Sequence, residues 1–148
     1  MTATVDAITA GARSESPLWA ASLRREPEWE PIFGDLVPEA IALGLETVYE
    51  AYLVHYGRAR LFAPDDPDEA VLLGDYLYAH GLVRIAEAGG VEAVAVMAEL
   101  ISTCAALRAA GETDDGAAWI EAVRGLGGVP EATQISVAIE RHSARVAS

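Results

Sequence analysis

A nearly apolar helical run in the middle of the chain most strongly limits what this sequence can fold into. Residues 71–78 are apolar apart from Asp75. Asp66 followed by Pro67 is typical of a helix start, because an aspartate caps free amides and a proline needs no amide partner there. Gly89 and Gly90 predict a stop after about residue 87. A helix that is apolar on most sides must be covered by neighbours, so the run predicts a helix inside a bundle.

A second long helix is predicted to begin at Pro38, because a proline fits the first position of a helix. Its apolar positions follow the spacing of one buried face: Ile41, Leu45, Val48, Tyr52 and Tyr56. The acidic residues between them are expected on more solvated faces: Glu39, Glu46 and Glu50. The helix is expected to reach Phe62 at the furthest, because Pro64 and the two aspartates after it favour a connection.

The rest of the chain predicts shorter elements and no strand. Further helices are expected at residues 91–110, 114–126 and 129–146, with Gly111 ending the first of them. Aromatic residues among prolines predict a short helix and turns over residues 17–37. Residues 1–16 show no helical period and are expected to form a flexible arm. The sequence therefore predicts an all-α fold, a single bundle of about five main helices over residues 17–148.

Composition excludes several classes of protein. The 148 residues suit one domain, and 52% apolar content is enough for a sizeable core. A net charge of −13 disfavours binding to nucleic acid or to anionic lipid. The single cysteine, Cys104, excludes an internal disulfide and is compatible with a reducing cytoplasm. We expect a cytoplasmic protein without a secretory signal or a transmembrane segment, since charges interrupt its most apolar stretch, residues 91–110.

Three segments resemble the trans-prenyl diphosphate synthases over roughly residues 39–112. They are Leu-Val-His-Tyr-Gly-Arg-Ala-Arg at 53–60, Leu-Leu-Gly-Asp-Tyr-Leu at 72–77, and Gly-Glu at 111–112. In that family the first segment reads roughly Leu-Ile-His-Asp-Asp-x-x-Asp, and its carboxylates bind magnesium. Here Tyr56, Gly57 and Arg60 stand in their place, and the sequence ends before the helix expected to carry the second aspartate motif. The resemblance thus implies a prenyl-synthase-like chain with no catalytic residues, metal site or cofactor.

The resemblance implies a regulatory or interaction subunit of a prenyl diphosphate synthase. Heteromeric enzymes of this family pair an inert small subunit with a catalytic large one, and the partner here would be that catalytic subunit. A homodimer would satisfy the same need to cover apolar helix surface. An oligomer is therefore expected.

The alternative is a small helical bundle that carries an isoprenoid or another apolar ligand. Its pocket is predicted among Tyr52, Tyr56, Leu72, Asp75 and Tyr76, because aromatic residues inside a bundle would set the depth of a cavity. Arg58 and Arg60, near the carboxyl end of the helix that is predicted to begin at Pro38, could contact a diphosphate.

A third hypothesis is a metal-dependent enzyme, since Asp65, Asp66 and Glu69 match Asp-Asp-x-x-Glu and Asp75 follows on the same helix. Pro67 favours a different interpretation. It places the first acidic residues at a helix start, where they would cap amides and complement the helix dipole, and the same is expected of the pair at 114–115.

Overall fold

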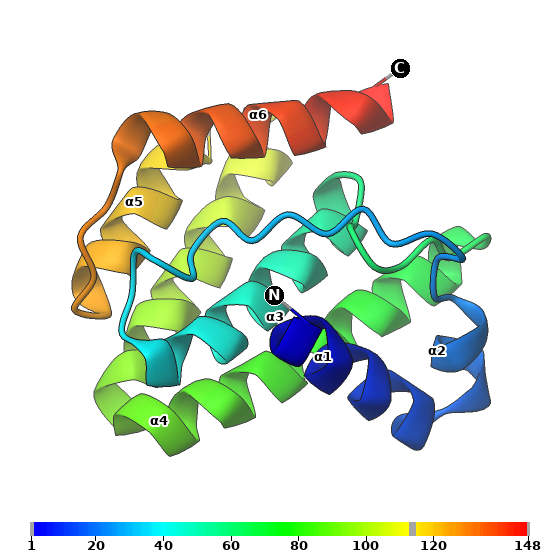
Figure 1. Ribbon diagram of the computed structural model, residues 1–148. Helices are drawn as coiled ribbons and strands as arrows, with labels where there is room; N and C mark the ends of the chain where they lie inside the picture. The colour runs from blue at the N-terminus through cyan, green and yellow to red at the C-terminus, as the bar shows by residue number, and fades with distance from the viewer. Residues whose placement is uncertain (1, 113–114, 148) are drawn as a thin grey trace.

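The computed structural model describes residues 2–112 and 115–147, and all regular elements in these ranges are helices. They are α1 (Thr2–Glu15), α2 (Pro17–Ala21), α3 (Glu39–Tyr56), α4 (Pro67–Ala109), α5 (Gly116–Gly125) and α6 (Ala132–Ala147). The predicted all-α fold class is confirmed. In Figure 1, α3 runs through the middle of the molecule, α4 lies behind and below it, and α6 crosses the top.

The central contact of the fold joins α3 to α4. Leu45, Val48 and Leu53 of α3 are fully buried. Two glycines let the helix backbones approach each other. A Cβ atom on Gly81 would lie 3.2 Å from the carbonyl oxygen of Gly44, so any larger side chain at Gly81 would force the helices apart.

Helix α4 contains the break that the sequence predicted. Gly90 has φ 71° and ψ −163°, which is not helical. The two halves of α4 run in clearly different directions on either side of this residue, so the second half turns up toward α5 and α6 (Figure 1). At the start of α4 the carboxylate of Asp66 accepts a hydrogen bond from the amide of Asp68 at 2.8 Å, as expected of a cap.

Residues 2–15 form a helix, contrary to the expected flexible arm. Ile8 and Ala12, one turn apart, are both buried, and Val5 packs beside them. Arg84 of α4 also donates a hydrogen bond to the carbonyl of Ala7 at 3.3 Å. The helical period was missed because one of its buried positions is only an alanine, whose small side chain gives little contrast with the neighbouring small residues.

Two acidic residues of α3 are buried, contrary to the expected solvated positions. Glu46 is 2% exposed and Glu50 is fully buried, and between them lies the guanidinium of Arg60, itself 1% exposed. Arg60 Nη1 lies 2.6 Å from Glu46 Oε1, and Arg60 Nε lies 3.0 Å from Glu50 Oε1. We call these three residues the buried charge network. A cation beside both carboxylates makes their burial tolerable.

The buried charge network also fastens two irregular segments to α3. Glu46 Oε2 accepts hydrogen bonds from the amides of Ile32 and Phe33, each at 2.8 Å. Glu50 Oε2 accepts one from the amide of Leu61 at 2.7 Å. Helix α3 consequently ends at Tyr56, short of the expected limit at residue 62, and the chain after it is held extended against the carboxylates.

We predict that replacing Arg60 with methionine lowers the free energy of unfolding by about 3–5 kcal/mol, because two carboxylates would remain buried without their cation. Urea denaturation measures the loss. The matched control is Arg124→Met, which removes an exposed ion pair with Glu121 and should change stability by less than about 1 kcal/mol. Equal losses in the two variants would contradict a structural role for the network.

Replacing Gly90 with alanine should lower stability by about 1–3 kcal/mol, because its backbone conformation strains any residue with a side chain. A Cβ at this position would meet nothing within 4 Å, so the loss has no steric part. Gly34→Ala is the control, since a Cβ there is also uncrowded and its φ lies outside the positive range. Thermal and urea unfolding of both variants measures the loss of stability. An unchanged stability of the Gly90→Ala variant would refute the strain.

Candidate functional site

The first half of α4 leaves an apolar side uncovered. Its inner side is buried against α3 and includes Leu73, Leu77 and Ile85. The opposite side is exposed, and we call it the α4 outer face, which consists of Val71, Leu72, Asp75, Ala79, Val83 and Ala86. These residues recur at helical spacing and form a continuous stripe. Contiguous exposed apolar surface of this kind marks interaction sites in many proteins.

The large side chains of the α4 outer face are more than half exposed. The exposed fractions are 55% for Val71, 57% for Leu72 and 55% for Val83. The sequence predicted a helix buried in a bundle, and the structure corrects that expectation for this side. The bundle is thin at this point, because α3 covers the inner side of α4 and no other described helix covers the outer one.

Asp75 lies at the water-facing centre of the α4 outer face. Its side chain is 64% exposed, and its Oδ1 atom lies 3.5 Å from Nε2 of His55 on α3. The same imidazole nitrogen lies 3.2 Å from the carbonyl oxygen of Val71. The carboxylate inside the apolar run is thus tolerated because it reaches solvent and a histidine.

Tyr52 is buried and Tyr56 is partly buried beside it, and the Tyr52 ring also contacts Trp119 of α5. Tyr52 donates a hydrogen bond to Oδ2 of Asp115, and Arg108 Nη2 donates to the Tyr52 oxygen at 3.0 Å. Arg108 Nε also lies 3.0 Å from Asp115 Oδ2, and its guanidinium lies over the Tyr56 ring. Burial, followed by the hydrogen bond to Asp115, raises the pKa of Tyr52. The phenol therefore stays neutral and acts as a donor.

Asp115 does not cap α5, although it stands at the position where the sequence predicted a cap. Its side chain makes no capping hydrogen bond and is fully buried. The carboxylate turns instead toward Tyr52 and Arg108, because a cation and a hydroxyl satisfy a buried charge better than an amide alone. Asp114, the other half of the predicted pair, lies outside the described residues.

The five residues predicted for one ligand pocket lie in three places. Tyr52 and Tyr56 face Asp115 in the interior. Leu72 and Asp75 belong to the α4 outer face. Tyr76 stacks on Trp19 of α2, with ring centroids 6.1 Å apart, and on His80. The structure therefore does not gather them around one cavity.

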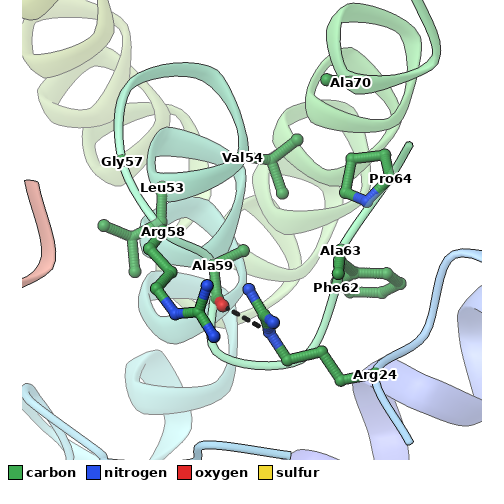
Figure 2. A pocket seen from close by; sticks show the side chains of 10 residues that line it. All are labelled: Arg24, Leu53, Val54, Gly57, Arg58, Ala59, Phe62, Ala63, Pro64 and Ala70. Carbon is green, nitrogen blue, oxygen red and sulfur yellow. Dashed lines mark hydrogen bonds between the residues drawn. The ribbon is translucent and has the colours of Figure 1, made fainter. Parts of the chain in front are cut away.

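The two arginines that were proposed to contact a diphosphate lie in different environments. Arg60 is buried in the charge network and is not accessible to an external ligand. Arg58 is partly exposed and pairs with Glu28 through Nε and Nη2, at 3.0 and 3.1 Å. Arg58 lines a pocket together with Arg24, as Figure 2 shows. Sequence reasoning missed Arg24, because only the fold brings it beside a residue 34 positions further along the chain.

Helix α6 is tied to the interior through His142. Its ring is 2% exposed, with Nδ1 2.6 Å from the Tyr49 oxygen and Nε2 3.5 Å from Glu30 Oε2. Burial, followed by the positive charge of Arg60, lowers the pKa of His142 to about 4. The imidazole is therefore neutral in the folded protein near pH 7.

We predict that stability falls as the pH drops from about 6.5 toward 4, because unfolded His142 takes up a proton with a pKa near 6.5 while the folded state resists it. The stabilising contribution of the neutral ring is complete above pH 6.5. In urea titrations between pH 6.5 and 5, His142→Asn should show a shallower dependence than the unaltered chain. Identical slopes would contradict the depressed pKa.

Two further properties bear on the kind of site. Among the described residues no group of three or more His, Cys, Asp or Glu side chains is placed to hold a metal ion. The length and composition of α4 are those of a helix that could cross a membrane, a property that core helices of soluble proteins share.

None of the protein-family models, curated proteins or solved structures that were compared with this chain matches it.

Proposed function

We propose that this chain is a non-catalytic, prenyl-synthase-like protein that acts as a regulatory or interaction subunit of a prenyl diphosphate synthase. The α4 outer face is the observation that carries the proposal of a protein partner. The nature of that partner rests on the resemblance of residues 53–60 and 72–77 to the synthase family. The two supports are independent of each other.

Covering the large side chains of the α4 outer face would stabilise a complex. Val71, Leu72 and Val83 each hold more than half of their surface in water. Burying the exposed part of the three side chains contributes roughly 3 kcal/mol at the usual value for burying an aliphatic side chain. That gain is available only to an assembly, and the smaller alanines between them let a partner helix approach closely.

The position of Asp75 favours a protein over a lipid surface as the partner. Its carboxylate lies among the apolar side chains of the α4 outer face and is 64% exposed. Burying it in hydrocarbon would be costly, whereas a protein can supply a cation or a hydroxyl opposite it. The net charge of −13 adds repulsion from anionic headgroups.

The proposal of an inert subunit rests on the residues at 56–60. Where the resembled family has magnesium-binding carboxylates, this chain has Tyr56, Gly57 and Arg60. Arg60 is committed to two carboxylates of its own helix bundle. Its replacement by an acidic residue would leave Glu46 and Glu50 buried against a third negative charge, so this part of the fold is adapted to a cation.

The test is the mass in solution, by light scattering, of the protein alone and mixed with a catalytic prenyl synthase from the same cell. We expect a defined mixed complex and an altered length of the prenyl product. Val83→Glu should weaken the complex at least about tenfold, since it places a charge at a contact that excludes water. Val129→Glu is the control, because Val129 is 73% exposed but lies between α5 and α6.

Other outcomes would redirect the assignment. A homodimer that ignores the synthase and that Val83→Glu dissociates would show that a second copy covers the α4 outer face, which overturns the heteromeric proposal. A monomer that floats with neutral lipid vesicles would identify a membrane as the occupant. A mixed complex that both substitutions leave intact would place the interface elsewhere on the chain.

A further inference from the structure

A pocket lies between the end of α3, the segment that follows it and the start of α4, and two arginines stand at one side of it (Figure 2). Its volume is about 350 Å3. We call it the arginine pocket, and its lining residues are Arg24, Leu53, Val54, Gly57, Arg58, Ala59, Phe62, Ala63, Pro64 and Ala70. It is separate from the α4 outer face, with which it shares no residue.

The fold holds the two guanidinium groups beside each other. Arg24 Nε donates a hydrogen bond to the carbonyl oxygen of Ala59 at 2.9 Å. Arg58 is held by its two hydrogen bonds to Glu28. Figure 2 shows the two guanidinium groups on either side of the Ala59 carbonyl. Burial lowers the pKa of Arg24, and the positive charge of the neighbouring Arg58 acts in the same direction. A bound anion would relieve the repulsion between the two guanidinium groups.

The charge around the arginine pocket is unusual for this chain. None of its ten described lining residues is acidic, although the chain has 23 acidic residues and only 10 basic ones. Glu28 stands outside the lining and pairs with Arg58, so the positive charge of the two guanidinium groups is partly offset before any ligand binds. The carboxyl end of α3 adds the negative end of its helix dipole nearby. This balance suits an anion of single charge better than a phosphate or diphosphate.

The remaining lining of the arginine pocket is apolar. Leu53 and Phe62 are fully or almost fully buried and form a fixed wall. In Figure 2, Val54, Pro64 and Ala70 lie across the pocket from the guanidinium groups. An oxyanion held by the arginines would therefore have hydrocarbon surface beside it. The volume lies within the range of small-molecule sites, at its lower end.

We propose that the arginine pocket binds a small amphiphilic monocarboxylate, with the carboxylate on the pocket side of the Arg24 and Arg58 guanidinium groups and a short hydrocarbon chain against Val54, Pro64 and Ala70. Guanidinium groups bind carboxylates through charge-assisted hydrogen bonds, which supply direction as well as affinity. The apolar wall selects for the chain. This site is independent of the proposed subunit function, since it would bind its ligand whether or not the α4 outer face is covered.

The test is titration of the full chain with sodium octanoate, followed by calorimetry and by amide chemical shifts of residues 57–63. Arg24→Met should weaken octanoate binding at least about tenfold, since it removes the half-buried member of the cationic pair. Arg25→Met is the matched control, because it removes the same charge from an exposed neighbour outside the pocket and should leave the affinity within about twofold.

A second variant keeps both charges and tests the apolar half. Ala70→Leu narrows the pocket opposite the arginines and should also weaken octanoate, without removing any of the hydrogen bonds that hold Arg24 and Arg58. Circular dichroism establishes that each variant is folded. Because this substitution adds a side chain at a partly exposed position, it keeps the proposal testable even if Arg24→Met fails to fold.

Three comparison ligands separate the sources of binding. Acetate carries the head without the chain and octanol the chain without the head, and we expect both to bind at least about tenfold more weakly than octanoate. Octyl phosphate carries a higher charge and should bind no more tightly. Absence of octanoate binding, equal binding of acetate, or affinity unchanged by Arg24→Met would each overturn the proposal. A clear preference for octyl phosphate would overturn the choice of a carboxylate.

Discussion

The burial of one arginine between two glutamates is the constraint on which the rest of this fold depends. Glu46 and Glu50 lie one turn apart on α3, and Arg60 reaches both of them from the segment after that helix. Each carboxylate also accepts hydrogen bonds from backbone amides of irregular segments, Glu46 from Ile32 and Phe33 and Glu50 from Leu61. Since an unpaired charge in this position would be strongly destabilising, the polar contacts select one path for both segments.

The packing of α3 against α4 determines which side of α4 is buried and which is left exposed as the α4 outer face. Glycines at 44 and 81 bring the two helices close, so the inner side of α4 is buried over its whole first half. The break at Gly90 then directs the second half of α4 toward α5 and α6. No described helix is left to cover the opposite side, which explains how a chain with ample apolar content still leaves one stripe in water.

Local signals in the sequence predicted the fold class and some of the helix ends, and long-range contacts account for the errors. Asp66, Gly90 and Gly111 act through their own backbone and could be read directly. The burial of Glu50 could not be predicted from local signals, because it depends on Arg60, a cation ten positions away. Asp115 was assigned to a cap for the same reason, since its partners Tyr52 and Arg108 come from other helices. Arg58 was identified as a candidate contact, whereas Arg24 joins it only through the tertiary fold.

The contacts of α6 have a consequence for the order in which the molecule assembles. Tyr49 and His142 are 93 residues apart, and Glu30 and Arg141 are 111 apart, so these two contacts of α6 close much larger loops than the contacts between α3 and α4. Large loops lose more chain entropy on closure, which favours late docking of this helix. The helix is therefore suited to detach and return as a cooperative unit while the central helix pair stays folded.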